Sequence, residues 1–494
     1  MTADSLKSTR LPAQRDEAKA GLVGAARGGL ANLVGAVIAA VAGVGVTWLV
    51  ARSLGPEQAG SFFAATSAFV LAGSIARLGT STALVYWPAR LRAQGHPELI
   101  RACLRAGLVP VAALSIVLAI VLWFAAPHYF PHYQAPLRVL AVFLPLAALA
   151  EALLATTRGY RMMRPTVVLD KISRSGGQLL GIGLLALFGF TASVAEWAFA
   201  WALPYVFIFI AAAVLVGRKV PRTGPSHGMA GEFWRFTAPR AIASGAQTAL
   251  QRVDVMLVAA LAGLVPAAAY AVAGRFIVVG QLANGAISQA VQPRLAESLS
   301  IGDRATARGL YQTATAWLVL ISWPLHLLVL NYAGFYLKFF GPAYVSAVPA
   351  VRILALGMLI GTGCGMVDIV LSMAGRTTWN LMNVLIALGT MITLDVLLIP
   401  ALGIVGAAIG LAAAVVVNNL LPLAQLGISL RLHPFGKQTL TAMALAGFSF
   451  GVIPVLTGPA GAGLGIAAYA LGLWLLSTRL ELAVILAARR RRAR

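Results

Sequence analysis

Stretches of about 20 apolar residues recur along the whole length of this 494-residue chain, and they constrain its fold more than any other feature. A stretch of that length crosses the hydrocarbon core of a bilayer as a single α-helix. Apolar residues make up 60% of the chain and charged residues only 11%, against about 25% charged residues in a typical soluble domain. The mean hydropathy is +0.85. The sequence therefore predicts an all-α polytopic membrane protein, in which only the termini and short loops meet water.

We count fourteen candidate membrane-spanning segments. They lie at approximately 29–51, 60–86, 104–126, 137–157, 166–190, 193–216, 238–263, 266–290, 309–331, 347–371, 380–400, 403–428, 438–457 and 461–486. The fifth is the least regular, because Asp170, Lys171 and Arg174 fall in its first two turns. The polar start of the chain contains no apolar core of a signal peptide, so we expect the first span to be retained as a helix.

The distribution of basic residues predicts the orientation in the membrane. If the N-terminus is cytoplasmic, most of the 38 lysine and arginine residues fall in internal loops or tails. The external loops then hold Arg52, Arg138, Lys338 and Arg352, all near loop edges. Such a bias is typical of cytoplasmic loops. We therefore expect a multi-pass protein of the cell membrane with both termini in the cytoplasm, and we assign the net charge of +23 to topology, not to nucleic-acid binding.

Three pairs of loops indicate an internal repeat about 205 to 216 residues long. The turn from Ser53 resembles the one from Leu261, which pairs Gly55 with Gly263 and Phe62 with Tyr270. The basic loops from Pro88 and Pro293 also match, as do the turns from Thr156 and Ser372. Six helices per repeat keep both copies in the same orientation, so the repeat is parallel, with its axis along the membrane normal.

The predicted organisation is therefore two six-helix lobes around a central cavity, followed by two further helices. The predicted parts are a cytoplasmic tail (1–28), an N-lobe (29–235), a C-lobe (236–430), helices thirteen and fourteen (431–488) and a basic tail (489–494). The chain has no nucleotide-binding GxxxxGK[ST] motif, no HExxH motif and no CxxC pair. We therefore expect no enzyme activity, no metal site and no cofactor. A coupling cation, H⁺ or Na⁺, remains open.

Charged residues inside the seventh and eighth spans are the main candidates for function. Arg252 and Asp254 are two residues apart, about 200° around a helix, and so cannot pair with each other. Asp254 and Arg275 lie at similar distances from the external turn that joins the two spans, so we expect them to pair. Arg252 then either pairs with another acid, such as Asp368, or forms a cationic wall of the central cavity.

Basic residues in the first half of the chain have two interpretations each. Arg77 lies toward the cytoplasmic half of the second helix, where it either extends to the interface or faces the cavity. A basic set is expected at the cytoplasmic mouth of the cavity, although the general bias of internal loops also explains it. The members of this set are Arg161, Arg164, Lys171 and Arg174.

Four motifs resemble those of a known family. They are "SLGPEQAGSFF" (53–63), "RVDVMLVAALAGLVPAAAYAVAGR" (252–275), "PRLAESLSIGD" (293–303) and "FFGPAY" (339–344). Together with the parallel lobes and two trailing helices, they are similar to the polysaccharide-biosynthesis (Wzx-like) flippases of the multidrug/oligosaccharidyl-lipid/polysaccharide exporter superfamily. The resemblance covers roughly residues 25–430.

The resemblance implies a flippase that moves a polyprenyl-diphosphate-linked oligosaccharide to the outer leaflet by alternating access. Arginine binds phosphate oxygens bidentately, so Arg252, Arg275 and Arg77 are the expected substrate contacts. Asp254 and Asp368 would orient them or bind a coupling ion. Membrane lipid and glycosyltransferase or polymerase proteins are the expected partners.

Three alternatives remain open from the sequence. A lipid II flippase of peptidoglycan synthesis shares the fourteen helices and the cationic cavity. A multidrug antiporter binds organic cations, for which a cavity with Arg252 and Arg275 is a poor electrostatic match. A membrane scaffold that organises glycosyltransferases would leave the buried charges unexplained.

Overall fold

The structure is a computed structural model that describes residues 12–160, 162–188, 192–220, 228–477 and 479–480. Within these ranges the chain folds into helices joined by short turns, with no β-strand. This confirms the all-α prediction. The cytoplasmic-mouth residue Arg161 and the basic tail 489–494 lie outside the described residues.

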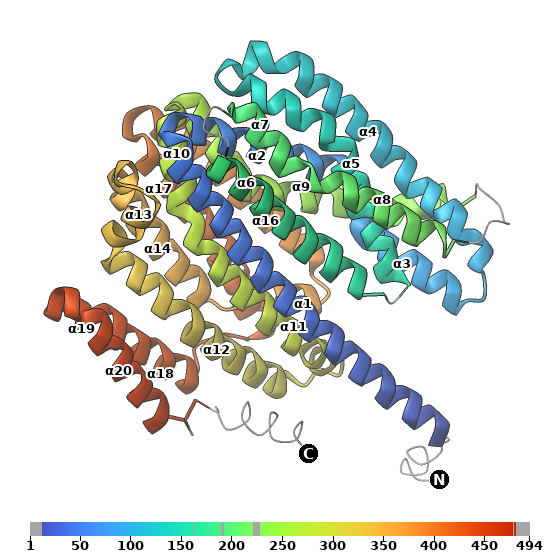
Figure 1. Cartoon of the computed structure of the whole chain (residues 1–494). Helices are drawn as coiled ribbons and strands as arrows, with labels where there is room; N and C mark the ends of the chain where they lie inside the picture. Colours follow the sequence, from blue (N-terminus) through green and yellow to red (C-terminus); the bar gives the residue numbers. More distant parts are fainter. Residues whose placement is uncertain (1–11, 161, 189–191, 221–227, 478, 481–494) are drawn as a thin grey trace, which may run out of the picture.

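The N-lobe helices pack around α5, which contacts α2, α3, α4, α7 and α8 (Figure 1). The elements of this half are α1 (Pro12–Ser53), α2 (Gly55–Ala76), α3 (Thr80–Ala93), α4 (Ile100–Tyr129), α5 (Gln134–Gly159), the π-helix η4 (Thr166–Arg174), α6 (Ser175–Phe188), α7 (Val194–Ala202) and α8 (Pro204–Gly217). Two short 3₁₀ turns, η2 (Pro97–Leu99) and η3 (Pro131–Tyr133), lie in the loops on either side of α4.

The C-lobe is built around α17, which contacts α9, α14, α15 and α16. Its elements are α9 (Ala230–Leu261), α10 (Leu264–Ala273), the 3₁₀ turn η5 (Gly274–Phe276), α11 (Ile277–Ser300), α12 (Arg304–Asn331), α13 (Ala333–Phe340), η6 (Pro342–Ala347), α14 (Val348–Gly363), α15 (Val367–Met373), α16 (Thr377–Leu402) and α17 (Ile404–Leu430).

The last helices form an appendage. They are α18 (Lys437–Ala446), the π-helix η7 (Gly447–Val452), α19 (Ile453–Thr457), η8 (Gly458–Ala460) and α20 (Gly461–Leu475). They pack against α12, on the flank of the molecule opposite to α4 (Figure 1). This agrees with the prediction of two trailing helices outside the repeat.

Eleven helical segments of the described residues are long and apolar enough to cross a membrane, against fourteen predicted spans. The difference has a physical reason. The segment 166–190 is interrupted by η4 and carries three charges, α9 carries Arg252 and Asp254, and the last two spans form one continuous helical segment, Lys437–Leu475. Each predicted span still has a helical counterpart among the described residues.

Two predicted boundaries fall inside helices. The division between tail and N-lobe at 28/29 lies within α1, and the division between the lobes at 235/236 lies within α9. Apolar composition marks only the part of a helix that lies in lipid, whereas the hydrogen-bonded helix continues into the polar residues beyond it. The boundary at 430/431 coincides with the end of α17.

The two lobes meet where α2 packs against α9 and α10. The predicted repeat is visible here, because Gly55 at the start of α2 and Gly263 just before α10 both adopt positive φ, 75° and 98°. Glycine adopts this conformation without the steric penalty that a Cβ brings. Further along α2, a Cβ placed on Gly60 would collide with the backbone of Leu264. The lobes therefore touch backbone to backbone at this point.

A second contact between the lobes joins α1 to the segment after α12. Trp48 Nε1 and Arg52 Nε donate hydrogen bonds to the carbonyl oxygen of Phe339, at 2.9 and 3.3 Å. The Tyr344 hydroxyl donates to the Ala51 carbonyl at 3.0 Å. These bonds close the gap between the lobes at the end of the bundle that the charge bias predicts to be external.

We expect Gly60→Ala to destabilise the protein by about 1–3 kcal/mol, the usual cost of over-packing a tight interface. The reason is that the added methyl group meets main-chain atoms of Leu264, which cannot rotate away. Thermal unfolding of the detergent-purified protein measures the effect. Gly43→Ala in α1 is the matched control, because a Cβ at Gly43 has nothing within 4 Å. Equal melting temperatures for the two variants would contradict the close contact.

Candidate functional site

A cavity of about 360 Å³ lies within the C-lobe. It opens between α9, α10, α11, α14, α16 and α17, and Ser67 of α2 completes its wall from the N-lobe. Four predicted site residues line it: Arg252, Arg275, Asp254 and Asp368. Charged groups within a membrane protein normally face a wet cavity or another charge. The position of these four residues agrees with that expectation.

Local helix geometry explains how α9 and η5 present their polar groups. Gln247, Gln251 and Asp254 are spaced by four and three residues, so they share one face of α9, which lines the cavity. Arg275 lies in η5, a 3₁₀ turn that interrupts the long helical segment between α10 and α11. Such interruptions frequently occur at functional positions.

Asp254 is bonded to a tyrosine, and the predicted pair with Arg275 was wrong. The Tyr270 hydroxyl donates to Asp254 Oδ2 at 3.0 Å, and the Val255 N–H donates to Oδ1 at 2.7 Å. No ion pair joins Asp254 to Arg275 in the described part of the chain. Counting residues from the turn gave a similar depth for both, but the carboxylate is bonded to Tyr270 of α10 instead. Tyr270 also reaches the Ala407 carbonyl at 3.4 Å, which ties Asp254 to α17.

Arg252 and Arg275 make no hydrogen bond or ion pair among the described residues, so the alternative pair Arg252–Asp368 is not formed either. Arg275 Nε is buried, and its guanidinium lies 5.9 Å from the centre of the Phe63 ring of α2. The two cations also interact repulsively with each other. They therefore form a cationic wall, the second of the two arrangements considered for Arg252.

Arg77 does not line the C-lobe cavity. It forms an ion pair with Glu151 of α5 within the N-lobe, an acid that the sequence analysis did not consider. Arg174 forms an ion pair with Asp170 at 2.8 Å, and its guanidinium lies 5.7 Å from the Tyr205 ring. The other mouth residues are separate: Arg164 is exposed in the loop before η4, and Lys171 lies beside α1.

Electrostatic interactions nevertheless connect the arginines of both lobes. Arg77 interacts with Arg174, Arg174 with Arg252, and Arg252 with Arg275. Asp170 and Glu151 compensate the two N-lobe cations directly. Both C-lobe cations interact with the carboxylate of Asp254 but form no ion pair with it among the described residues. A row of cations thus runs from the N-lobe to the cavity, with its uncompensated end in the C-lobe.

The sequence analysis missed the amide side chains of the cavity. Those that line it are Gln247, Gln251, Gln281, Asn284, Asn380, Asn418 and Asn419. The pair Asn418–Asn419 inside an otherwise apolar span was a signal that a search limited to charged residues passed over. Asp395 of α16 is a further acid of this lobe: it is buried, its carboxylate has no hydrogen-bond partner among the described residues, and it interacts with Asp254.

The fold is shared with several solved transporter structures. A lipid II flippase MurJ in an inward closed conformation has a TM-score of 0.73 and 13% identity, over 90% of this chain and 98% of that chain. An inward-facing multidrug resistance MATE family transporter of the MOP superfamily has a TM-score of 0.64 and 15% identity, over 80% and 97%. A MOP superfamily transporter from Pyrococcus furiosus has a TM-score of 0.56 and 16% identity, over 81% and 94%.

Fold and cavity together define a polytopic helical membrane protein with the MOP-type fold, two lobes and a polar cavity. The polysaccharide biosynthesis protein family matches residues 25–299, and the MatE family matches residues 239–397. The chain belongs to the polysaccharide biosynthesis protein family. No curated protein matches it. The family resemblance found in the sequence is thereby confirmed.

We expect Glu151→Gln to destabilise the protein, because it leaves Arg77 without its partner. The Glu151 side chain is 37% exposed, so water replaces part of the lost interaction. The expected cost is about 1–2 kcal/mol, less than the roughly 3–5 kcal/mol of a fully buried pair. Thermal unfolding of Glu151→Gln, Arg77→Gln and the double variant gives the coupling between them. Additive losses would show that the pair contributes nothing.

Proposed function

We propose that this protein is a flippase that moves a polyprenyl-diphosphate-linked oligosaccharide from the inner to the outer leaflet for the assembly of a cell-surface polysaccharide. Membership of the polysaccharide biosynthesis protein family and the MOP-type fold support transport of a lipid-linked substrate. The single observation that carries the proposal is the pair Arg252 and Arg275, two cations that line the cavity without a bonded partner among the described residues.

The chemistry of the substrate fits this pair. A diphosphate carries several anionic oxygens, and guanidinium groups bind such oxygens through two parallel, charge-assisted hydrogen bonds. A bound diphosphate would also relieve the repulsion between Arg252 and Arg275. Arg174 and Arg77 extend the positive field into the N-lobe, toward the expected cytoplasmic mouth.

Translocation requires the two lobes to rock, so that the cavity opens to each side in turn. The glycan then crosses in the wet interior, and the prenyl tail stays in lipid between the lobes. Closure on the external side is supported by the bonds of Trp48, Arg52 and Tyr344 between α1 and the region after α12. Glycosyltransferases or a polymerase that make and use the glycan are the partners we propose.

A coupling cation is the proposed source of energy, because the sequence has no nucleotide-hydrolysis motif. Asp254 and the unpartnered Asp395 are near enough to interact, and both are buried in the C-lobe. Two buried carboxylates that interact with each other favour binding of a proton or a monovalent cation, because ionisation of both is costly without compensation.

We expect Arg252→Ala to lower the initial flipping rate at least about tenfold, because one bidentate contact to the diphosphate is lost. The measurement uses proteoliposomes with a fluorescent polyprenyl-diphosphate oligosaccharide and follows protection from an external glycosidase. Arg138→Ala is the control, because Arg138 is on α5 and bonds the Trp123 carbonyl at 3.1 Å, outside the cavity.

Three results would contradict the proposal or redirect it. Equal protection in liposomes without protein would remove the flippase assignment. A strong preference for a lipid II probe over the peptide-free glycan probe would favour the peptidoglycan alternative. Protein-dependent efflux of a cationic dye, insensitive to Arg252→Ala, would favour a multidrug antiporter.

We expect the flipping rate of the wild type to rise with a gradient of H⁺ or Na⁺, and Asp254→Asn to abolish that rise. The neutral amide keeps an acceptor for Tyr270 but cannot take up a proton or balance a cation. Rates measured with each gradient imposed separately identify the ion. A wild-type rate that is independent of both gradients would exclude coupling at Asp254.

A further inference from the structure

We propose that the C-lobe cavity contains a subsite for the sugar unit attached to the diphosphate, and that uncharged amide side chains recognise its hydroxyl groups. The inference rests on the proposed function and deepens it, since it names the sugar unit next to the diphosphate as the part of the substrate that the C-lobe recognises. The residues concerned, called here the amide wall, are Gln247, Gln251, Gln281, Asn284 and Asn418.

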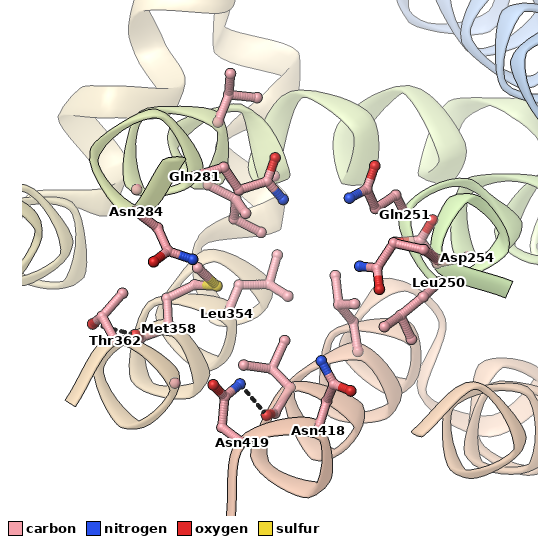
Figure 2. A pocket seen from close by; sticks show the side chains of 18 of the residues that line it. Leu250, Gln251, Asp254, Gln281, Asn284, Leu354, Met358, Thr362, Asn418 and Asn419 are labelled. Carbon is pink, nitrogen blue, oxygen red and sulfur yellow. Dashed lines mark hydrogen bonds between the residues drawn. The ribbon is translucent and has the colours of Figure 1, made fainter. Parts of the chain in front are cut away.

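The amide wall has unused hydrogen-bonding capacity. A side-chain amide has two N–H donors and an oxygen with two lone pairs. In the described part of the chain, Gln247, Gln251, Gln281 and Asn418 make no hydrogen bond within the protein, and Asn284 only accepts one from Ser288, at 3.3 Å. Figure 2 shows Gln251, Gln281 and Asn418 directed into the same space from three different helices.

Another pair of amides in the same lobe has a purely structural role. Asn383 of α16 and Gln425 of α17 bond each other reciprocally, at 2.8 and 2.9 Å. They satisfy one another and need no ligand. The side chains of the amide wall face the cavity instead. Gln247, Gln251 and Gln281 are exposed to the cavity, and Asn284 and Asn418 are half-buried. Their free donors and acceptors therefore bind either water or a polar ligand.

The asparagine residues of the chain are concentrated around the C-lobe cavity. The sequence contains seven asparagines, and Asn32 is the one that falls within 29–235. Four of the others line the cavity: Asn284, Asn380, Asn418 and Asn419. Amide side chains are unfavourable in an apolar bilayer-spanning segment, so their concentration around one cavity indicates that they have a function there.

The chemistry favours a sugar over other ligands. Each sugar hydroxyl both donates and accepts a hydrogen bond, which matches the amide group. An organic cation would meet Arg252 and Arg275 in the same cavity. A second anionic group would require further cations, which the amide wall does not supply.

Position and size agree with this assignment. The first sugar of such a substrate is bonded directly to the diphosphate, so its subsite must adjoin the phosphate-binding arginines. Arg252 lies in α9 beside Gln251, and both residues line the same cavity. The volume of about 360 Å³ is at the lower end of ligand pockets, which are roughly 300–1,000 Å³, and so suits one end of a glycan and not a whole oligosaccharide.

The test compares the affinity of purified full-length protein in nanodiscs for two kinds of probe. One is a polyprenyl diphosphate without sugar. The other is a panel of the same lipid carrying one glucose, galactose, mannose or N-acetylglucosamine. We expect at least one sugar probe to bind about tenfold more tightly than the bare diphosphate, as two or three added hydrogen bonds allow. In Gln281→Met and Asn418→Leu, which keep side-chain size, we expect that ratio to fall toward one.

The control is Gln58→Met, because Gln58 is exposed on α2 and does not line the cavity. It should retain the full ratio. No advantage for any sugar probe in the wild type, or an equal loss of affinity for bare and sugar probes in the variants, would overturn the subsite while leaving the flippase proposal intact. If the wild type bound neither kind of probe, or bound both without dependence on Arg252, the proposed function itself would fail.

Discussion

The cost of leaving an arginine uncompensated inside a membrane protein is the constraint on which the site depends. Four arginines interact electrostatically across the interior, and they differ in whether a carboxylate is paired with them. Arg77 and Arg174 each have a carboxylate partner in the N-lobe. Arg252 and Arg275 have none among the described residues, and both line the cavity. Such groups require water or an anion, so the C-lobe must stay polar and hollow around them.

The remaining polar groups of the C-lobe are organised around this requirement. The Tyr270 hydroxyl donates to Asp254, which makes no ion pair with Arg275 in the described part of the chain. The same hydroxyl also reaches the Ala407 carbonyl of α17, and the buried Asp395 of α16 interacts with Asp254. The two arginines and the amide wall are thus two chemically distinct parts of one cavity, with the buried Asp395 outside its lining. In the function proposed above, they would bind the diphosphate and the sugar of the substrate.

The interface between the lobes has a different basis. Gly60 allows α2 and α10 to approach backbone to backbone, while the contact between α1 and Phe339 uses side-chain donors to main-chain carbonyls. In the proposed rocking motion, such contacts can separate and re-form without breaking an ion pair between the lobes, since the described residues form none there.

The sequence by itself determined the membrane class, the helical segments, the repeat and the charged residues of the cavity. Bilayer thickness and the positive-φ glycines act locally, so they leave a pattern that is readable residue by residue. It did not determine which charges pair. The partners of Asp254 and Arg77 turned out to be Tyr270 and Glu151. Side-chain direction and helix-to-helix contact decide such pairs, and neither is encoded in spacing along one helix. Only the tertiary structure brought the scattered amides together, because they come from three helices far apart in the chain.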